Sequence, residues 1–168
     1  QYQHFLSNSP WSADEVKKKV GQDSSSLMAS QKIKTGKPTG LLLDESSHLK
    51  KGKSSVGVSR QYAGIIGKVD NCQVGVYASL CNDKHSTLID EALFLPKEWI
   101  EDEARCLKAG IPKEWIKYKT KPELALDLVD TAIANGVEFD WVGGDGLYGH
   151  NSELQNGLDA RGLLYVLD

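Results

Sequence analysis

The 168-residue chain has little cysteine and no long hydrophobic run, and both absences narrow its class. Its three cysteines, Cys72, Cys81 and Cys106, are odd in number and lack C-x-x-C spacing, so we expect reduced cytosolic thiols rather than disulfides or a zinc site. No run of about 18 apolar residues is present, so we expect no transmembrane helix, and no secretory signal opens the chain. The chain begins at Gln1 rather than Met, so we expect either a fragment or a trimmed form of a longer protein.

Motifs of nucleophilic hydrolases are also missing. There is no G-x-S-x-G, no Cys–His pair in a recognisable context, and no metal-ligand spacing among the four histidines. A net charge of −3, from 20 basic and 23 acidic residues, argues against nucleic-acid binding through overall charge. The charges are unevenly distributed, however, because residues 46–69 hold five basic side chains and no acid.

The pattern of apolar and turn-forming residues divides the chain into a helical lead-in, residues 1–40, and a core, residues 41–168. In the lead-in, a capping box at Ser12 begins a short helix that Gly21 ends. A second helical piece is expected over residues 25–33, and its inward-facing side chains are Leu27, Met28 and Ile33.

The core pattern predicts an α/β fold with a mixed five-stranded sheet and flanking helices. Short connections favour three antiparallel strands first, and a later helix then places a new strand parallel to, and beside, the first strand. Strands are expected over residues 41–45, 54–63, 72–80, 139–143 and 163–167, with a further edge strand over 88–95. Helices are expected over residues 96–109, 120–135 and 152–161.

Two aspartates follow apolar strands and form the candidate catalytic centre. Three leucines at 41–43 lead into Asp44, and residues 139–144 lead in the same way into Asp145. A carboxylate beside a buried strand is costly unless its charge is compensated, commonly by a metal ion. Paired carboxylates hold divalent ions for phosphodiester chemistry. The pattern alone does not separate such a metal site from acids that merely form turns or cap helices.

A glycine motif in the same place predicts a different site. Gly144, Gly146 and Gly149 form G-x-G-x-x-G after a strand, and Asp168 follows about 20 residues on, as in dinucleotide-binding loops. Against this interpretation, Asp145 would add negative charge where pyrophosphate should lie. The next helix also has its own cap, Asn151 or Ser152. A dinucleotide-binding oxidoreductase fragment is therefore the second hypothesis.

Basic residues follow Asp44 closely and are candidate phosphate contacts. Lys50, Lys51 and Lys53 lie where a phosphate-rich ligand at the aspartates would pass. Arg60 and Tyr62 add a bidentate donor and a stacking ring, a combination common in nucleic-acid contacts. Without the metal hypothesis, the same residues are better explained as a solvated surface, or for Tyr62 as a core ring.

Several blocks of the chain resemble the catalytic core of bacterial insertion-sequence transposases with a DDE triad. They are LLLDESSHLKKGK (41–53), SVGVSRQY (55–62), GKVDNCQV (67–74), TKPELA (120–125) and VGGDGLYG (142–149). The resemblance implies a ribonuclease-H-like fold, Mg²⁺ or Mn²⁺ as cofactor, and cleavage and strand transfer at transposon ends. It also implies that Asp44 and Asp145 are the first two acids of the triad.

The third acid of that family, a glutamate, lies on a helix after the last core strand. This chain stops at Asp168, before such a helix, and neither Asp168 nor Glu153 matches the motif. We therefore assign no third acid and expect either a core that is incomplete at its C-terminus or a non-catalytic DNA-binding remnant. The expected partner is DNA without membrane contact, in the bacterial cytoplasm at the nucleoid, and the resemblance allows a homodimer of the full-length protein.

Overall fold

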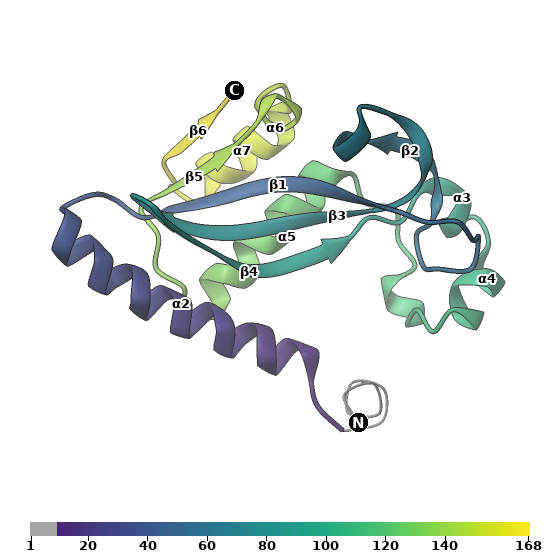
Figure 1. Cartoon of the computed structure of the whole chain (residues 1–168), viewed down its shortest axis with the longest axis horizontal. Coiled ribbons are helices and arrows are strands. Elements are labelled where there is room, and N and C mark those ends of the chain that lie inside the picture. The colour runs from purple at the N-terminus through teal and green to yellow at the C-terminus, as the bar shows by residue number, and fades with distance from the viewer. Residues whose placement is uncertain (1–9) are drawn as a thin grey trace.

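A computed structural model describes residues 10–168, and its centre is one mixed six-stranded sheet (Figure 1). The long strand β3 pairs antiparallel with β1 along one side, and with β2 and β4 along the other. On its other side β1 pairs in parallel with β5, and β5 with β6. The strands are β1 (Gly40–Leu49), β2 (Ser59–Ala63), β3 (Lys68–Asn82), β4 (His85–Leu93), β5 (Trp141–Gly144) and β6 (Tyr165–Leu167).

This topology confirms the expected order of strands, including the further edge strand, which is β4. The predicted strand over 54–63 is wrong in its first half. Val58 donates its N–H to the Ser55 carbonyl in a turn, and its side chain is buried against Trp99. Residues 54–58 therefore lie outside the sheet, where the Val58 side chain is buried. Strand pairing begins at Ser59.

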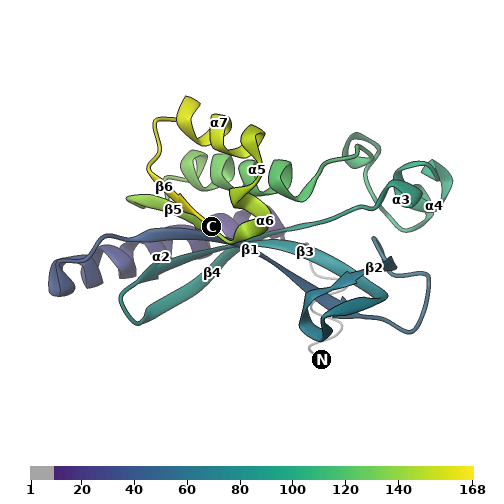
Figure 2. The same ribbon diagram turned by 90° about the horizontal axis from the view of Figure 1, so that it is seen from above.

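Helices pack mainly on one face of the sheet, where α5 and α7 lie together (Figure 2). Among residues 10–168, no helix is long and apolar enough to cross a bilayer. The helices are α2 (Ala13–Thr35), α3 (Lys97–Ile100), α4 (Glu103–Lys108), α5 (Lys121–Ala134), α6 (Gly146–Gly149) and α7 (Ser152–Ala160), with 3₁₀ turns η1 (Gly64–Ile66) and η2 (Lys113–Trp115).

The lead-in is one continuous helix, α2, rather than the two predicted pieces. Gly21 does not end it, because this glycine is buried within the helix where it approaches the Val137 side chain. Met28 faces the core as predicted, but Leu27 and Ile33 are 67% and 87% exposed, so their predicted inward orientation is wrong. The part of the lead-in prediction on residues 1–9 lies outside the described residues.

Two short helices replace the single helix predicted over 96–109. Asp102 lies between α3 and α4. It caps α4 by accepting a hydrogen bond from the Arg105 N–H. Together α3 and α4 form a small core around Trp99, whose indole N–H donates to the Val58 carbonyl at 2.8 Å. The Cys106 thiol is buried in this core, and all three cysteines are free, as expected.

Helix α5 covers the centre of the sheet and matches its prediction. Thr120 accepts from the Glu123 N–H while the Glu123 carboxylate accepts from the Thr120 N–H, which completes the predicted capping box. The buried face of α5 lies over β3 and β4 and belongs to the same core cluster as Leu41, Leu43 and Val142 of β1 and β5. This shared core fixes which sides of β1 and β5 turn towards the core and which turn away.

Replacement of Thr120 by alanine tests the contribution of the capping box. We expect Thr120→Ala to lower the free energy of unfolding by about 1 kcal/mol, because the first turn of α5 loses its side-chain acceptor. Urea titration followed by circular dichroism measures the change. Ser30→Ala in the middle of α2 is the control and should leave stability nearly unchanged; an equal loss in both variants would contradict the capping role.

Candidate catalytic site

Parallel pairing of β1 with β5 brings the two predicted aspartates to neighbouring positions. Leu42 of β1 lies opposite Gly143 of β5, and Leu43 lies opposite Gly144. The next residues after these pairs are Asp44 and Asp145. Adjacent strands lie about 4.8 Å apart, which places the two backbones within reach of one shared cation. Asp145 directly follows β5, as predicted. Asp44 does not end its strand, however, because β1 continues to Leu49 along β3.

Both aspartates belong to the face of the sheet opposite α5. Along β1, Leu41 and Leu43 are buried in the core cluster that includes the inward residues of α5, whereas Asp44 is exposed. On β5, a Cβ placed on Gly143 would lie 2.7 Å from the Leu42 side chain, so Gly143 and Leu42 share the second face. Since alternate residues of a strand share a face, Asp44 and the position of Asp145 also turn towards that face.

The electrostatics of Asp44 report the proximity of Asp145. Partial burial raises the pKa of Asp44, and the negative charges of Asp145 and Glu45 raise it further. The Glu45 N–H opposes this shift by donating to Oδ1 of Asp44 at 2.7 Å. Asp145 is held similarly, because its Oδ1 accepts from the Leu147 N–H at 3.1 Å. Each aspartate therefore has a fixed orientation, and the two repel each other.

The carboxylates of Asp44 and Asp145 fit a divalent cation and would supply two of its ligands. Within residues 10–168 neither aspartate forms an ion pair, so no protein cation relieves their repulsion. Carboxylate oxygens are the ligands that Mg²⁺ and Mn²⁺ prefer. In the same part of the chain no three His, Cys, Asp or Glu side chains gather as a metal cluster. The described residues thus supply a carboxylate pair and no third acid.

The sequence did not predict a cluster formed by Glu45, Lys121 and Tyr148 on the face of the sheet opposite the aspartate pair. Glu45 points to the opposite face from Asp44, where its Oε1 lies 3.1 Å from Nζ of Lys121 at the start of α5. Tyr148 of α6 is fully buried, and burial followed by the Glu45, Asp44 and Asp145 charges raises the pKa of its phenol. Among the described residues, the Tyr148 hydroxyl and Oε2 of Glu45 have no hydrogen-bond partner.

The signal for this group was present but weak. Tyr148 follows Asp145 by one helical turn, and Lys121 lies in the capping segment of α5, yet their convergence on Glu45 needs the folded sheet. Tyr148 packs against Gly144, and its N–H donates to the Asp145 carbonyl at 2.9 Å. Tyr148 therefore fixes the turn that carries Asp145.

The glycine motif does not form an open loop for pyrophosphate. α6 starts at Gly146, and Asp145 caps it. A Cβ on Gly149 would overlap the carbonyl oxygen of Asp168, so the chain's own backbone occupies the space beside this glycine. As predicted, α7 starts afterwards with Asn151 as its cap. The backbone of Asp168 therefore occupies the space beside Gly149 that the pyrophosphate of a dinucleotide would need.

The predicted phosphate contacts lie on exposed segments beyond the end of β1. Lys50, Lys51 and Lys53 belong to the turn after β1, and Arg60 lies on β2. The Asn71 side chain holds this turn by donating to the carbonyls of Lys50 and Gly52 at 2.7 and 2.9 Å. All four basic side chains are exposed, and none forms an ion pair with a described residue.

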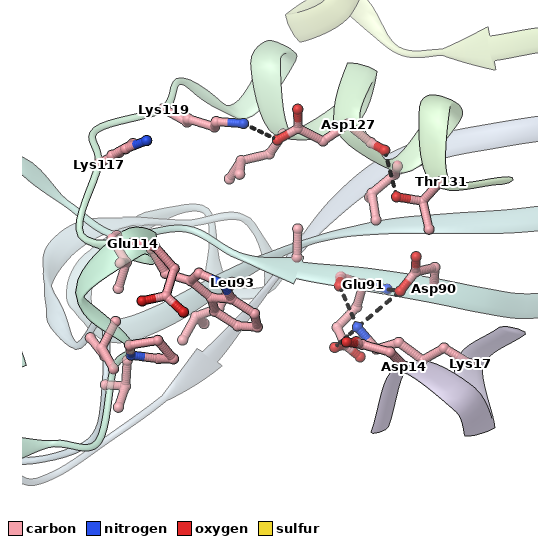
Figure 3. Close-up of a pocket in the computed structure, with 18 of the residues that line it drawn as sticks. Asp14, Lys17, Asp90, Glu91, Leu93, Glu114, Lys117, Lys119, Asp127 and Thr131 are labelled. Atoms are coloured by element: carbon pink, nitrogen blue, oxygen red, sulfur yellow. Dashed lines mark hydrogen bonds and ion pairs between the residues drawn. The ribbon is translucent and has the colours of Figure 1, made fainter. Parts of the chain in front are cut away.

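A pocket lies elsewhere, between α2, α5, β4 and the segment before α5 (Figure 3). Its volume is about 950 Å³, and neither predicted aspartate lines it. Lys17 pairs with Asp90 and Glu91 across its wall, and Lys119 pairs with Asp127. The aspartate pair instead lies on an open surface, which suits a polymeric substrate better than a small molecule that must be enclosed.

This fold and site define the class of protein. A mixed sheet in which an antiparallel meander is followed by parallel strands is consistent with a ribonuclease-H-like fold. A family model described as DDE superfamily endonuclease matches residues 1–168, and the chain belongs to this family.

One curated relative supports the same assignment. The chain is 32% identical over 167 residues to a probable transposase for insertion sequence element IS701 from Microchaete diplosiphon. The alignment covers 98% of this chain and 39% of the relative, so the chain spans about two fifths of the relative's length. No solved structure matches the chain.

Replacement of Asp44 by asparagine tests the repulsion within the pair. Because the pKa of Asp44 is higher in the folded protein than in the unfolded chain, its ionisation opposes folding. This cost is absent below the unfolded pKa and complete above the folded pKa. Without metal at pH 7, we expect Asp44→Asn to be more stable than the wild type by up to about 1 kcal/mol, after screening of an exposed pair.

The gain should disappear as the pH falls to about 3, where Asp44 is protonated in both states. Urea titrations in EDTA at the two pH values measure it. Glu114→Gln, at an exposed acid outside the pair, serves as the control. An Asp44→Asn variant that is less stable than the wild type at pH 7 would contradict the repulsion.

Proposed function

We propose that this chain forms part of the catalytic domain of a DNA transposase and contributes to metal-dependent cleavage of phosphodiester bonds at transposon ends. The observation that carries the proposal is the placement of Asp44 and Asp145 on adjacent parallel strands, unpaired and mutually repelling. The family and the IS701 relative support DNA as the substrate.

Each part of the site has a role in this proposal. Asp44 and Asp145 would hold Mg²⁺ or Mn²⁺, which when bound activates an attacking oxygen and stabilises the leaving oxygen. Lys50, Lys51, Lys53 and Arg60 would bind phosphates of the DNA and keep the strand over the aspartates. Glu45, Lys121 and Tyr148 lie behind the pair and fix the strands that carry it. After cleavage, the freed 3′-hydroxyl would attack a phosphodiester of target DNA, and the 3′-oxygen of the target strand would leave from the same phosphorus.

A second candidate function is DNA binding without catalysis. It is favoured by the observation that residues 10–168 gather two carboxylates and no third metal-binding side chain. Such a remnant would bind DNA through its basic residues, with a salt dependence set by the number of phosphates contacted. Loss of Asp44 or Asp145 would not abolish that binding.

Manganese binding and DNA nicking distinguish the two candidates. We expect Mn²⁺ at about ten times its Kd to stabilise the chain by about 1.4 kcal/mol, or roughly 3–6 °C in Tm. Asp44→Asn and Asp145→Asn should each remove this shift, whereas Glu114→Gln should keep it. Nicking of supercoiled plasmid in Mn²⁺ should fall by at least about a hundredfold in each aspartate variant, because a bound metal contributes several kcal/mol.

The outcome that contradicts the proposal is equally specific. If Mn²⁺ leaves the Tm of the wild type unchanged and no nicking occurs, while DNA binding persists in both aspartate variants, the non-catalytic candidate is correct. Repeating the titration with Mg²⁺ identifies the preferred ion. Sedimentation of the full-length protein on a transposon end tests the homodimer.

A further inference from the structure

The face of the sheet that carries Asp44 stays open along the rest of β1. Beyond Asp44, the side chains of Ser46 and His48 are exposed, whereas the alternate residue Ser47 is buried. The same alternation occurs on β2, where Arg60 and Tyr62 are exposed between buried Ser59 and Ala63. α5 and α7 lie on the other side of the sheet (Figure 2), and neither helix covers these exposed side chains.

An aromatic ring lies flat on this open face beside the aspartates. Tyr77 of β3 is directly opposite Asp44. A Cβ on Gly75 would lie 2.9 Å from the Tyr77 ring, so the glycine allows the ring to lie against the sheet. The Tyr77 hydroxyl is 2.9 Å from Nε2 of His48, and the two rings meet edge to face at 76°. The pair forms a rigid aromatic surface next to Asp44.

A second aromatic surface lies further along the same face. Arg60 pairs with Asn71, and Tyr62 pairs with Val69, which places both β2 side chains on the face of Asp44, His48 and Lys50. Tyr62 is 59% exposed and Val69 is 52% exposed. Lys50 joins the row because its N–H donates to the Asn71 carbonyl at 2.9 Å.

Charge along this row favours a polyanion. The segment from Ser46 to Val69 contains five basic residues and no acid. Tyr77 has two acidic strand partners, Asp44 on β1 and Glu91 on β4, and Lys17 pairs with the Glu91 carboxylate at 2.7 Å. From Asp44 to Lys50 the strand rises about 3.3 Å per residue, or about 20 Å in total, which is long enough for a few nucleotides.

We propose that these residues bind an unpaired DNA strand and lead its end to the aspartates. We call them the strand track; its members are Tyr77, His48, Lys50, Arg60 and Tyr62. The bases would stack on Tyr77 and Tyr62 while Lys50 and Arg60 contact phosphates. An unpaired strand is favoured over a duplex because flat rings on an open sheet bind the faces of bases, which a duplex hides. The assignment rests on the proposed function, which places the reacting phosphate at Asp44 and Asp145.

Binding of labelled oligonucleotides in EDTA tests the strand track without any metal. The probes are a fluorescent 12-nucleotide oligothymidylate and a blunt duplex of the same length, followed by anisotropy. We expect the single strand to bind more tightly than the duplex. Tyr62→Ala should weaken single-strand binding at least about fivefold, because one stacked base is lost, and Tyr62→Phe should stay within about twofold.

Two further variants sharpen the result. Arg60→Ala should reduce the slope of log K against log salt by about one, as loss of a single phosphate contact requires. Tyr118→Ala, at a partly exposed tyrosine outside the track, is the matched control and should bind like the wild type. Tighter duplex binding, equal affinity of Tyr62→Ala and wild type, or no binding of either probe would each overturn the inference.

The same assay separates failure of the strand track from failure of the proposed function. Asp44→Asn should bind the single strand at least as tightly as the wild type, because a negative charge beside the track is removed. Tyr62-dependent binding in a chain that shows neither Mn²⁺ binding nor nicking would preserve the track and reject only the catalytic proposal. Nicking without Tyr62-dependent binding would do the reverse.

Discussion

The structure depends on the parallel pairing of β1 with β5. These strands are separated by the whole antiparallel meander and by α5, and their registration places Asp44 beside Asp145. Burial of Leu41, Leu43 and Val142 in the core cluster that they share with α5 holds the pair in register, because a shift by one residue would turn these apolar side chains towards solvent. The same hydrophobic contact that stabilises the sheet therefore fixes the spacing of the two carboxylates.

The two faces of β1 lie in different environments. One face carries Leu41, Leu43 and Glu45 into the core, where Lys121 and Tyr148 surround the Glu45 carboxylate. The other carries Asp44, Ser46 and His48, which are exposed. Because successive residues of a strand point to opposite faces, the adjacent acids Asp44 and Glu45 experience different environments. One lies in solvent beside a second carboxylate, and the other is compensated by a lysine.

Membership of the DDE superfamily endonuclease family gives this arrangement its chemical meaning. The position of Asp44 within β1, rather than at its end, has a consequence for substrate binding. Since β1 continues past Asp44 along β3, the sheet itself extends beside the carboxylate pair, and the proposed strand track lies on this extension. A strand that stopped at Asp44 would leave only loops there.

The sequence by itself determined the order of elements, the capped helix α5 and the two aspartates at adjacent strands, because these depend on local hydrophobic periodicity, capping residues and short connections. It did not determine whether α2 continues through Gly21, where β2 begins, or how far β1 extends. Contact with Val137 decides the first point, contact with Trp99 the second, and pairing with β3 the third. Only the tertiary structure brought Glu45, Lys121 and Tyr148 together and aligned Tyr77 and Tyr62 on one face. Such groupings arise from strand register and sheet pairing, which join residues that no local pattern connects.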